Sequence, residues 1–217
     1  MKAAERDGQE VPREPNVPSL SHHLLTWAHN NRWANHRLLQ ACAQLDPIAF
    51  GARRTSFFPS IKATLNHKLT IDWYYVDAME RALRREPPNA NWAAFFEPRE
   101  PMDTCTQLAA AQQQVDERLI RICKGLDEER LVLSVIVPRR SGPCPERLDR
   151  LLAHLFEHQV HHRGQVHAML AGTEIAPPQL DEFFCESDAP LRASDFEELG
   201  YTEAGIWRGP SPPNRSQ

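Results

Sequence analysis

HLFEHQVHHRGQ, residues 154–165, places four histidines within nine residues of a segment whose apolar residues recur at helical spacing. On an α-helix, residues four apart are separated by about 40° in rotation and about 6 Å in rise. His158 and His162 can therefore direct two imidazoles at one metal ion. His154 lies on the same stripe but about 12 Å along the axis from His162, so the three cannot bind the same ion. A third ligand must come from another helix.

Two familiar helical metal motifs do not fit this segment. In the His-Glu-x-x-His helix of zinc proteases, the glutamate after the first histidine is the general base. Here that position is Gln159, which cannot take up a proton at neutral pH, so it is expected to play no part in a reaction. Bundle-type di-iron sites require Glu-x-x-His on each of two helices, whereas Val160 stands three residues after Glu157. A mononuclear site with few carboxylates remains.

Four long segments of the chain have the apolar periodicity of amphipathic helices. They span about 18–45, 59–85, 103–124 and 145–170, and Asp46-Pro47 and Gly125 are natural stops for the first and the third. Residues 131–137 are rich in β-branched side chains, which predicts a short extended segment before the last long helix. Four amphipathic helices in one domain predict an all-α four-helix bundle, in which metal ligands project from facing helices.

Composition limits the domain count and the class of partner. The 217 residues suffice for one domain with a large core, and the proline-containing polar stretches at 1–18 and 208–217 predict a flexible lead-in and a disordered tail around a domain at 19–207. The net charge of -4 argues against nucleic-acid binding. No apolar run approaches the roughly 20 residues that cross a bilayer. With no signal-peptide core and five widely spaced cysteines, the chain is expected to be cytoplasmic and free of disulfides.

His67 is the candidate for the third metal ligand. It lies on an inward-facing stripe of the second predicted helix, where a histidine needs a partner to offset its desolvation. The histidine pair on the fourth helix lacks a third ligand, which makes metal binding the favoured role for His67. By contrast, His22, His29 and His36 recur every seven residues among polar neighbours of the first helix, so that face is predicted to be solvated.

Three segments of the sequence, NRWAN at 31–35, LNH at 65–67 followed by Asp72-Trp73, and HQVHHRGQV at 158–166, resemble the DinB/YfiT-like family of bacterial four-helix proteins. The resemblance covers roughly residues 20–185. It implies a bundle with a short extended excursion before its last long helix. It also implies one divalent ion, most often nickel or zinc, with iron or manganese as alternatives. Carried over to this chain, the implied ligands are His67, His158 and His162.

Family members with an assigned activity resemble thiol-dependent S-transferases or isomerases, in which the metal activates a low-molecular-weight thiol. Three neutral imidazoles leave the ion its full charge and an open position, which lowers the pKa of a bound thiol or water. The leading hypothesis is such an enzyme, acting on a thiol such as glutathione and an electrophilic small molecule. A metal-dependent hydrolase and a non-catalytic, metal-stabilised stress-response bundle are the alternatives. The sequence offers no unambiguous carboxylate base, which favours the transferase.

Four further residues border the predicted cluster. Arg163 and Gln165 are expected to brace the ligands from a second layer of hydrogen bonds. His154 either orients a ligand or contacts substrate, or it is an inter-helix histidine held by a hydrogen bond. His161 is rotated away from both ligands of its helix, so it is expected to meet another helix or a partner subunit. Whether a homodimer forms is left open.

Overall fold

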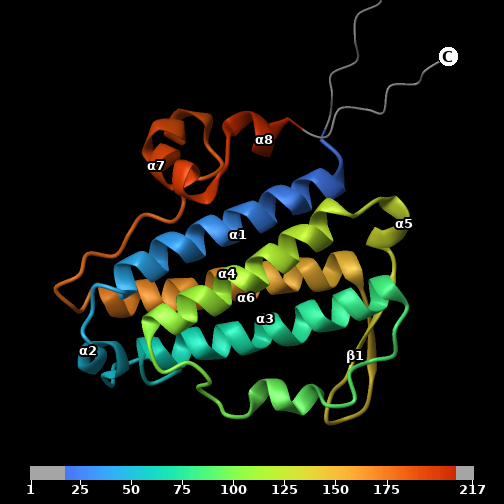
Figure 1. Cartoon of the computed structure of the whole chain (residues 1–217), viewed down its shortest axis with the longest axis horizontal. Helices are drawn as coiled ribbons and strands as arrows, with labels where there is room; N and C mark the ends of the chain where they lie inside the picture. Colours follow the sequence, from blue (N-terminus) through green and yellow to red (C-terminus); the bar gives the residue numbers. More distant parts are fainter. Residues whose placement is uncertain (1–17, 209–217) are drawn as a thin grey trace, which may run out of the picture.

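Four long helices run side by side and form the body of the protein (Figure 1). The computed structural model describes residues 18–208, so the predicted flexible ends lie almost wholly outside the described part of the chain. The long helices are α1 (Leu20–Cys42), α3 (Ile61–Arg84), α4 (Cys105–Lys124) and α6 (Leu148–Leu170). Both α1 and α3 pack against α4 and α6. The predicted all-α four-helix bundle is confirmed.

Side-chain caps set where the long helices begin. Ser19, Ser60 and Thr104 each accept a hydrogen bond from the backbone N–H three residues further on, which satisfies a donor that has no partner within the helix. The side-chain oxygen of Gln107 accepts a hydrogen bond from the backbone N–H of Thr104, which completes a capping box. Because a capping residue is not itself helical, these three helices begin slightly later than the apolar spacing predicts.

A β-hairpin precedes the last long helix. The strands β1 (Ser134–Val137) and β2 (Cys144–Arg147) pair antiparallel, after the short helix α5 (Glu128–Leu131). The predicted start of the fourth helix at Pro145 is wrong, because Pro145 pairs with Ile136 in the hairpin. β1 packs on α3, and the hydroxyl of Tyr74 donates a 2.5 Å hydrogen bond to the carbonyl oxygen of Pro138 at the end of β1. This bond anchors the tip of the hairpin to α3.

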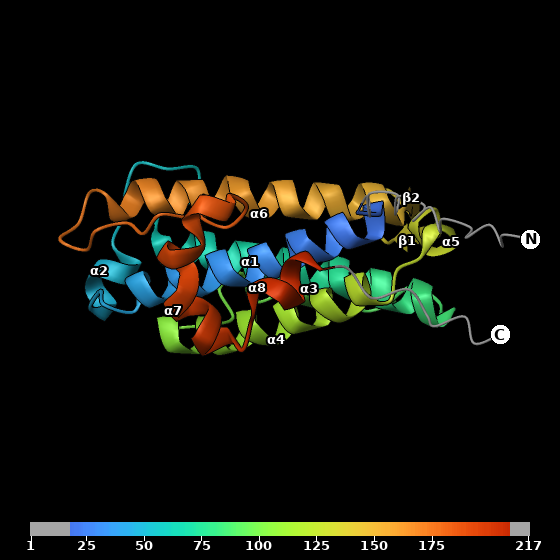
Figure 2. The ribbon, with the colours of Figure 1, turned by 90° about the horizontal axis from the view of Figure 1, so that it is seen from above.

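Shorter elements complete the described chain: α2 (Pro47–Gly51), η1 (Trp92–Phe96), η2 (Glu186–Asp188), α7 (Ala189–Leu199) and α8 (Glu203–Trp207). Figure 1 shows α7 and α8 on the side of α1 that faces away from α3, and in Figure 2 α7 lies across α1. Trp33 of α1 is fully buried beneath Phe183 and Phe196, and its indole nitrogen donates a 3.0 Å hydrogen bond to Asp195. The C-terminal segment therefore builds a second, smaller core on α1.

This C-terminal cover corrects the prediction that one face of α1 is solvated. The ring of His29 lies 4.8 Å from the ring of Tyr201, and Nε2 of His36 lies 3.0 Å from a carboxylate oxygen of Glu198. His22, His29 and His36 are all partly buried. The histidines on this face of α1 therefore lie at its contact with α7 and with the segment that follows α7.

Two further expectations concern the compartment of the protein. All five cysteines are free thiols, as predicted. Among residues 18–208, no helix is both long enough and apolar enough to cross a membrane.

Candidate metal centre

Three histidines from two facing helices meet inside the bundle. His67 comes from α3, while His158 and His162 come from successive turns of α6. One ring nitrogen of each lies within 4.8 Å of the other two, and the Nε2 atoms of His158 and His67 are 3.3 Å apart. Two nitrogens bound to one tetrahedral ion at about 2.0–2.1 Å are about 3.3–3.4 Å apart. The His67–His158 separation therefore fits a shared divalent ion with little movement.

Burial keeps these imidazoles neutral. Desolvation, and then the neighbouring His162, lowers the pKa of His67 to about 4. Desolvation, followed by His162 and His67, lowers the pKa of His158 to about 3. The pKa of His162 is also lowered, mainly by burial. Because only a neutral ring can give its lone pair to a cation, the cluster is ready to bind a metal ion at neutral pH.

Gln165 fixes the orientation of one of the three rings. Its Oε1 atom lies 2.8 Å from Nδ1 of His162, so Nδ1 carries the proton and donates, which leaves Nε2 free for an ion. The Nε2 atom of Gln165 lies 3.0 Å from Nε2 of His161, an exposed ring on the same helix. Gln165 thus makes the hydrogen bond to a clustered histidine that is expected of it. The effect of this bond on a bound metal stays a prediction.

Phe58 covers the cluster from the loop before α3. Its ring stacks on His67, with centroids 4.3 Å apart and planes 29° apart, and its centroid lies 5.6 Å from that of His162. Sequence reasoning missed this residue. The available signal was the aromatic pair Phe57-Phe58 shortly before the cap of α3 at Ser60. The stacked ring shields one side of His67 from water.

The other predicted neighbours lie at different distances from the cluster. The exposed His154 has its ring centroid 6.4 Å from that of His158, and its Nε2 lies 3.4 Å from the hydroxyl of Tyr75. Arg163 is buried and turned away: its guanidinium donates to Asn31 and Asn35, at 2.5 and 3.2 Å. The direct bracing of the histidines expected from Arg163 is therefore not found.

Arg163 belongs instead to a buried polar network beside the histidines. Each long helix contributes two polar side chains four residues apart, and none of the eight is more than 4% exposed. The pairs are Asn31 and Asn35, Lys68 and Asp72, Gln112 and Asp116, and Gln159 and Arg163. Three of the eight residues directly follow a histidine of the cluster in the sequence. The network thus joins all four helices at the level of the candidate metal site.

Amide side chains connect the charges of this network. The ammonium of Lys68 donates to three amide oxygens at 2.8–3.0 Å, and the amide of Gln112 donates to Asp72 and Asp116 at 2.8 and 3.0 Å. Desolvation nevertheless raises the pKa of Asp72 to about 6 and lowers that of Lys68 to about 8. Two cations and two anions leave no formal net charge, which makes their burial tolerable.

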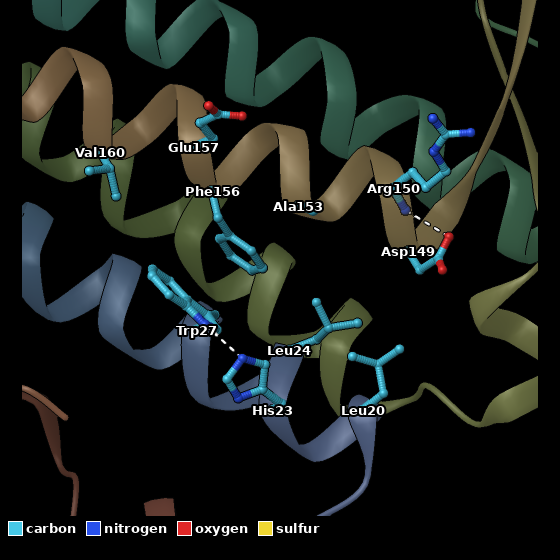
Figure 3. A pocket seen from close by; sticks show the side chains of 10 residues that line it. All are labelled: Leu20, His23, Leu24, Trp27, Asp149, Arg150, Ala153, Phe156, Glu157 and Val160. Carbon is cyan, nitrogen blue, oxygen red and sulfur yellow. Dashed lines mark hydrogen bonds between the residues drawn. The ribbon is translucent and has the colours of Figure 1, made fainter.

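A hollow of about 600 Å³ lies between α1 and α6, and its walls are mainly apolar (Figure 3). Trp27 and Phe156 line it from the two helices, with their ring centroids 6.0 Å apart, and the indole nitrogen of Trp27 donates to His23 at 3.1 Å. None of the three clustered histidines lines this hollow. It is therefore distinct from the candidate metal centre.

The family of the chain follows from a match to a known family model. The model described as the DinB family matches residues 20–194. The chain belongs to the DinB family. The match spans the four long helices and the three clustered histidines of this DinB protein, and it confirms the resemblance found in the sequence. A search of curated proteins finds no match.

The metal-free DinB protein should lose stability as the pH falls from about 7 to about 5. The histidine pKa is 6.5 when unperturbed and about 4 and about 3 for folded His67 and His158. Between those values the unfolded chain binds more protons than the folded chain, so acid favours unfolding. The two neutral histidines contribute their full stabilisation at pH values above 6.5, their pKa in the unfolded chain. This stabilisation is lost as the pH falls toward about 4 and about 3, the pKa values of His67 and His158 in the folded chain.

Urea unfolding of metal-free wild type and His158→Asn at about pH 7 and about pH 5 measures this effect. The variant should lose less of its free energy of unfolding between the two pH values. Asp72 has the opposite effect on the free energy of unfolding: its pKa is raised from 3.8 to about 6, so acid favours the folded state at this residue. Because Asp72 is present in both proteins, its effect cancels in the comparison. His161→Asn, at an exposed position of the same helix, should behave like wild type. An equal loss in His158→Asn and wild type would refute the assignment.

Proposed function

We propose that this DinB protein is a mononuclear metal-dependent enzyme that joins a low-molecular-weight thiol, such as glutathione, through its sulfur to an electrophilic small molecule, with release of the thiol proton. The observation that carries the proposal is the convergence of three histidines, with Nε2 atoms of two of them 3.3 Å apart. A divalent ion held by His67, His158 and His162, with zinc or nickel the first choices and iron or manganese the others, would supply a Lewis acid that lowers the pKa of a thiol.

Three of the protein's five cysteines are poor candidates for the sulfur nucleophile. Burial raises the pKa of Cys105 to about 11 and that of Cys123 to about 12, and it also raises the pKa of Cys42. Since the thiolate is the reactive form, these three side chains stay protonated and inert at neutral pH. This favours a nucleophile that arrives as a small molecule, as it would in a reducing cytoplasm.

Two alternatives use the same metal centre. A hydrolase would need a general base close to the ion, but among the described residues no aspartate or glutamate belongs to the three-histidine cluster. A non-catalytic bundle would need a closed site, whereas the cluster has three members and two of its rings are only partly buried. Both features favour the transferase. The choice between these functions does not depend on whether a homodimer forms. If one forms, the exposed ring of His161 is a candidate contact.

Calorimetric titration of glutathione into metal-loaded and metal-free protein tests the proposal. The metal-loaded form should bind at least about tenfold tighter, and binding should strengthen as the pH rises toward neutrality, because the thiol must release its proton. A variant that lacks all five cysteines should keep its transfer activity on a model electrophile. If no thiol distinguishes the two forms and the cysteine-free variant is inactive, the transferase proposal fails.

A further inference from the structure

A second hollow lies against the same helix that carries His67. It has a volume of about 390 Å³ and is enclosed by α3, η1 and the tip of the β-hairpin. One wall is aromatic, with the ring of Tyr74 6.0 Å from Trp92 and 5.2 Å from Phe96. The mouth carries two exposed cations, Arg139 and Arg140. This cavity combines a flat apolar surface with positive charge.

Neither Arg139 nor Arg140 forms an ion pair with a carboxylate of the described residues. Other arginines of this chain pair with carboxylates, such as Arg192 with Glu203 at 2.8 Å. Within the part of the chain that is described, no carboxylate lies within 4.0 Å of the guanidinium nitrogens of Arg139 or Arg140. Glu97 lines the same cavity and is the one acidic group among its lining residues. The charge balance at the mouth is therefore positive, which favours an anion.

The cavity is held in place next to the histidine cluster. The hydrogen bond from Tyr74 to Pro138 fixes the hairpin tip that carries both arginines. Ile71, one turn along α3 from His67, lines the cavity, and so does Tyr75, one turn further. The hydroxyl of Tyr75 lies 3.4 Å from His154, one turn before His158 on α6. The eight residue steps from His67 to Tyr75 span about 12 Å along the helix, which is the reach of an elongated small molecule.

We propose that this cavity binds the carboxylate of a substrate whose flat or apolar body lies on the aromatic wall and whose reactive atom reaches the three histidines. Planar guanidinium groups bind carboxylates through paired hydrogen bonds. The inference rests on the proposed function, because it assigns the two ends of one substrate to the cavity and to the metal centre. Both the thiol and the electrophile can carry a carboxylate, so the chemistry is shared by two sources.

Binding to metal-free protein separates this inference from the reaction itself. The probes are S-methylglutathione, which has carboxylates but no free thiol, and cinnamate, an aromatic carboxylate. At least one should bind by calorimetry, and the one that binds tighter identifies the substrate whose carboxylate the cavity takes. Arg139→Gln and Arg140→Gln should each weaken that binding about tenfold and their combination about 100-fold, since each removes a charge-assisted contact.

Two matched variants guard against indirect effects. Glu97→Gln should strengthen binding severalfold, because it removes a negative charge from the cavity wall, and a misfolded protein could not produce that sign. Arg150→Gln, an exposed cation beside the hollow between α1 and α6, should leave binding unchanged. Absence of binding by both probes, or an unchanged affinity in the double arginine variant, would overturn the inference. If the probes bind through the arginines while no thiol distinguishes metal-loaded from metal-free protein and the cysteine-free variant is inactive, the cavity stands and the transferase proposal falls.

Discussion

His158→Ala is expected to weaken binding of a divalent ion by more than about 100-fold, because it removes one of the three predicted ligands. Removal of a hydrogen-bonding partner behind a ligand already costs about 10–100-fold in metal affinity, and this substitution removes a bond to the ion itself. His67→Ala and His162→Ala should behave in the same way, because one ring nitrogen of each lies within 4.8 Å of the others. Elemental analysis of protein purified without chelator, followed by competitive zinc titration, measures the loss.

The same helix supplies matched controls for this experiment. His154 and His161 are exposed histidines within one turn of a predicted ligand, and alanine at either position should leave one ion bound per chain. Gln165→Ala should give an intermediate loss of about 10–100-fold, because Gln165 holds His162 through its Nδ1. Wild-type metal content and affinity in His67→Ala would show that the third ligand is assigned wrongly.

Local spacing explains which parts of the site could be predicted from sequence. His158 and His162 share one helix, so their separation is fixed by helical geometry alone. His67 could be selected because it lies on an inward stripe of a second helix that the bundle brings opposite the first. Phe58 could not, since it belongs to the non-helical stretch before α3 and reaches His67 only through the path of that loop.

The C-terminal segment was missed for a related reason. Long-range contacts hold it on α1: Arg37 pairs with Asp195 and Glu182, both at 2.6 Å. Arg192 is fully buried and pairs with Glu203. A charged residue in a sequence usually indicates a solvated face, and nothing local distinguishes these arginines from exposed ones. Propensity and periodicity therefore predicted the bundle but not the layer that covers it.

The buried polar network, in contrast, left a signal in the sequence. Lys68 and Asp72 lie four residues apart on an otherwise apolar side of α3, and the other long helices carry pairs at the same spacing. Four such pairs are what a polar layer across a four-helix bundle requires, because each helix must present two side chains to the same level. Their adjacency to the histidines indicates that the network fixes the relative register of α3 and α6 at the metal centre.

Lys68→Met should therefore lower the free energy of unfolding by about 3–5 kcal/mol, the typical loss when one partner of a buried charged group is removed. Methionine is unbranched like lysine and only one atom shorter, but it cannot donate, so the amide oxygens of Asn35, Gln112 and Gln159 each lose a hydrogen bond. The buried negative charges then outnumber the positive ones. Urea unfolding of the metal-free protein, in parallel with wild type, measures the loss.

A double-mutant cycle distinguishes the charge imbalance from a simple packing defect. Asp72→Asn removes one buried negative charge but keeps a side chain of the same shape, so the Lys68→Met/Asp72→Asn protein again has balanced buried charges. Its loss of stability should be smaller than the sum of the two single losses by at least about 1 kcal/mol, since neighbours in one network couple by about 0.5–3 kcal/mol.

Lys62→Met provides the control, because Lys62 is a partly exposed lysine on the same helix that pairs with Asp103 at the surface, and such pairs contribute about 0–1 kcal/mol. If the losses from Lys68→Met and Asp72→Asn are additive, the two charges act independently. The network would then be a set of separate buried hydrogen bonds, and it would not set the alignment of the helices.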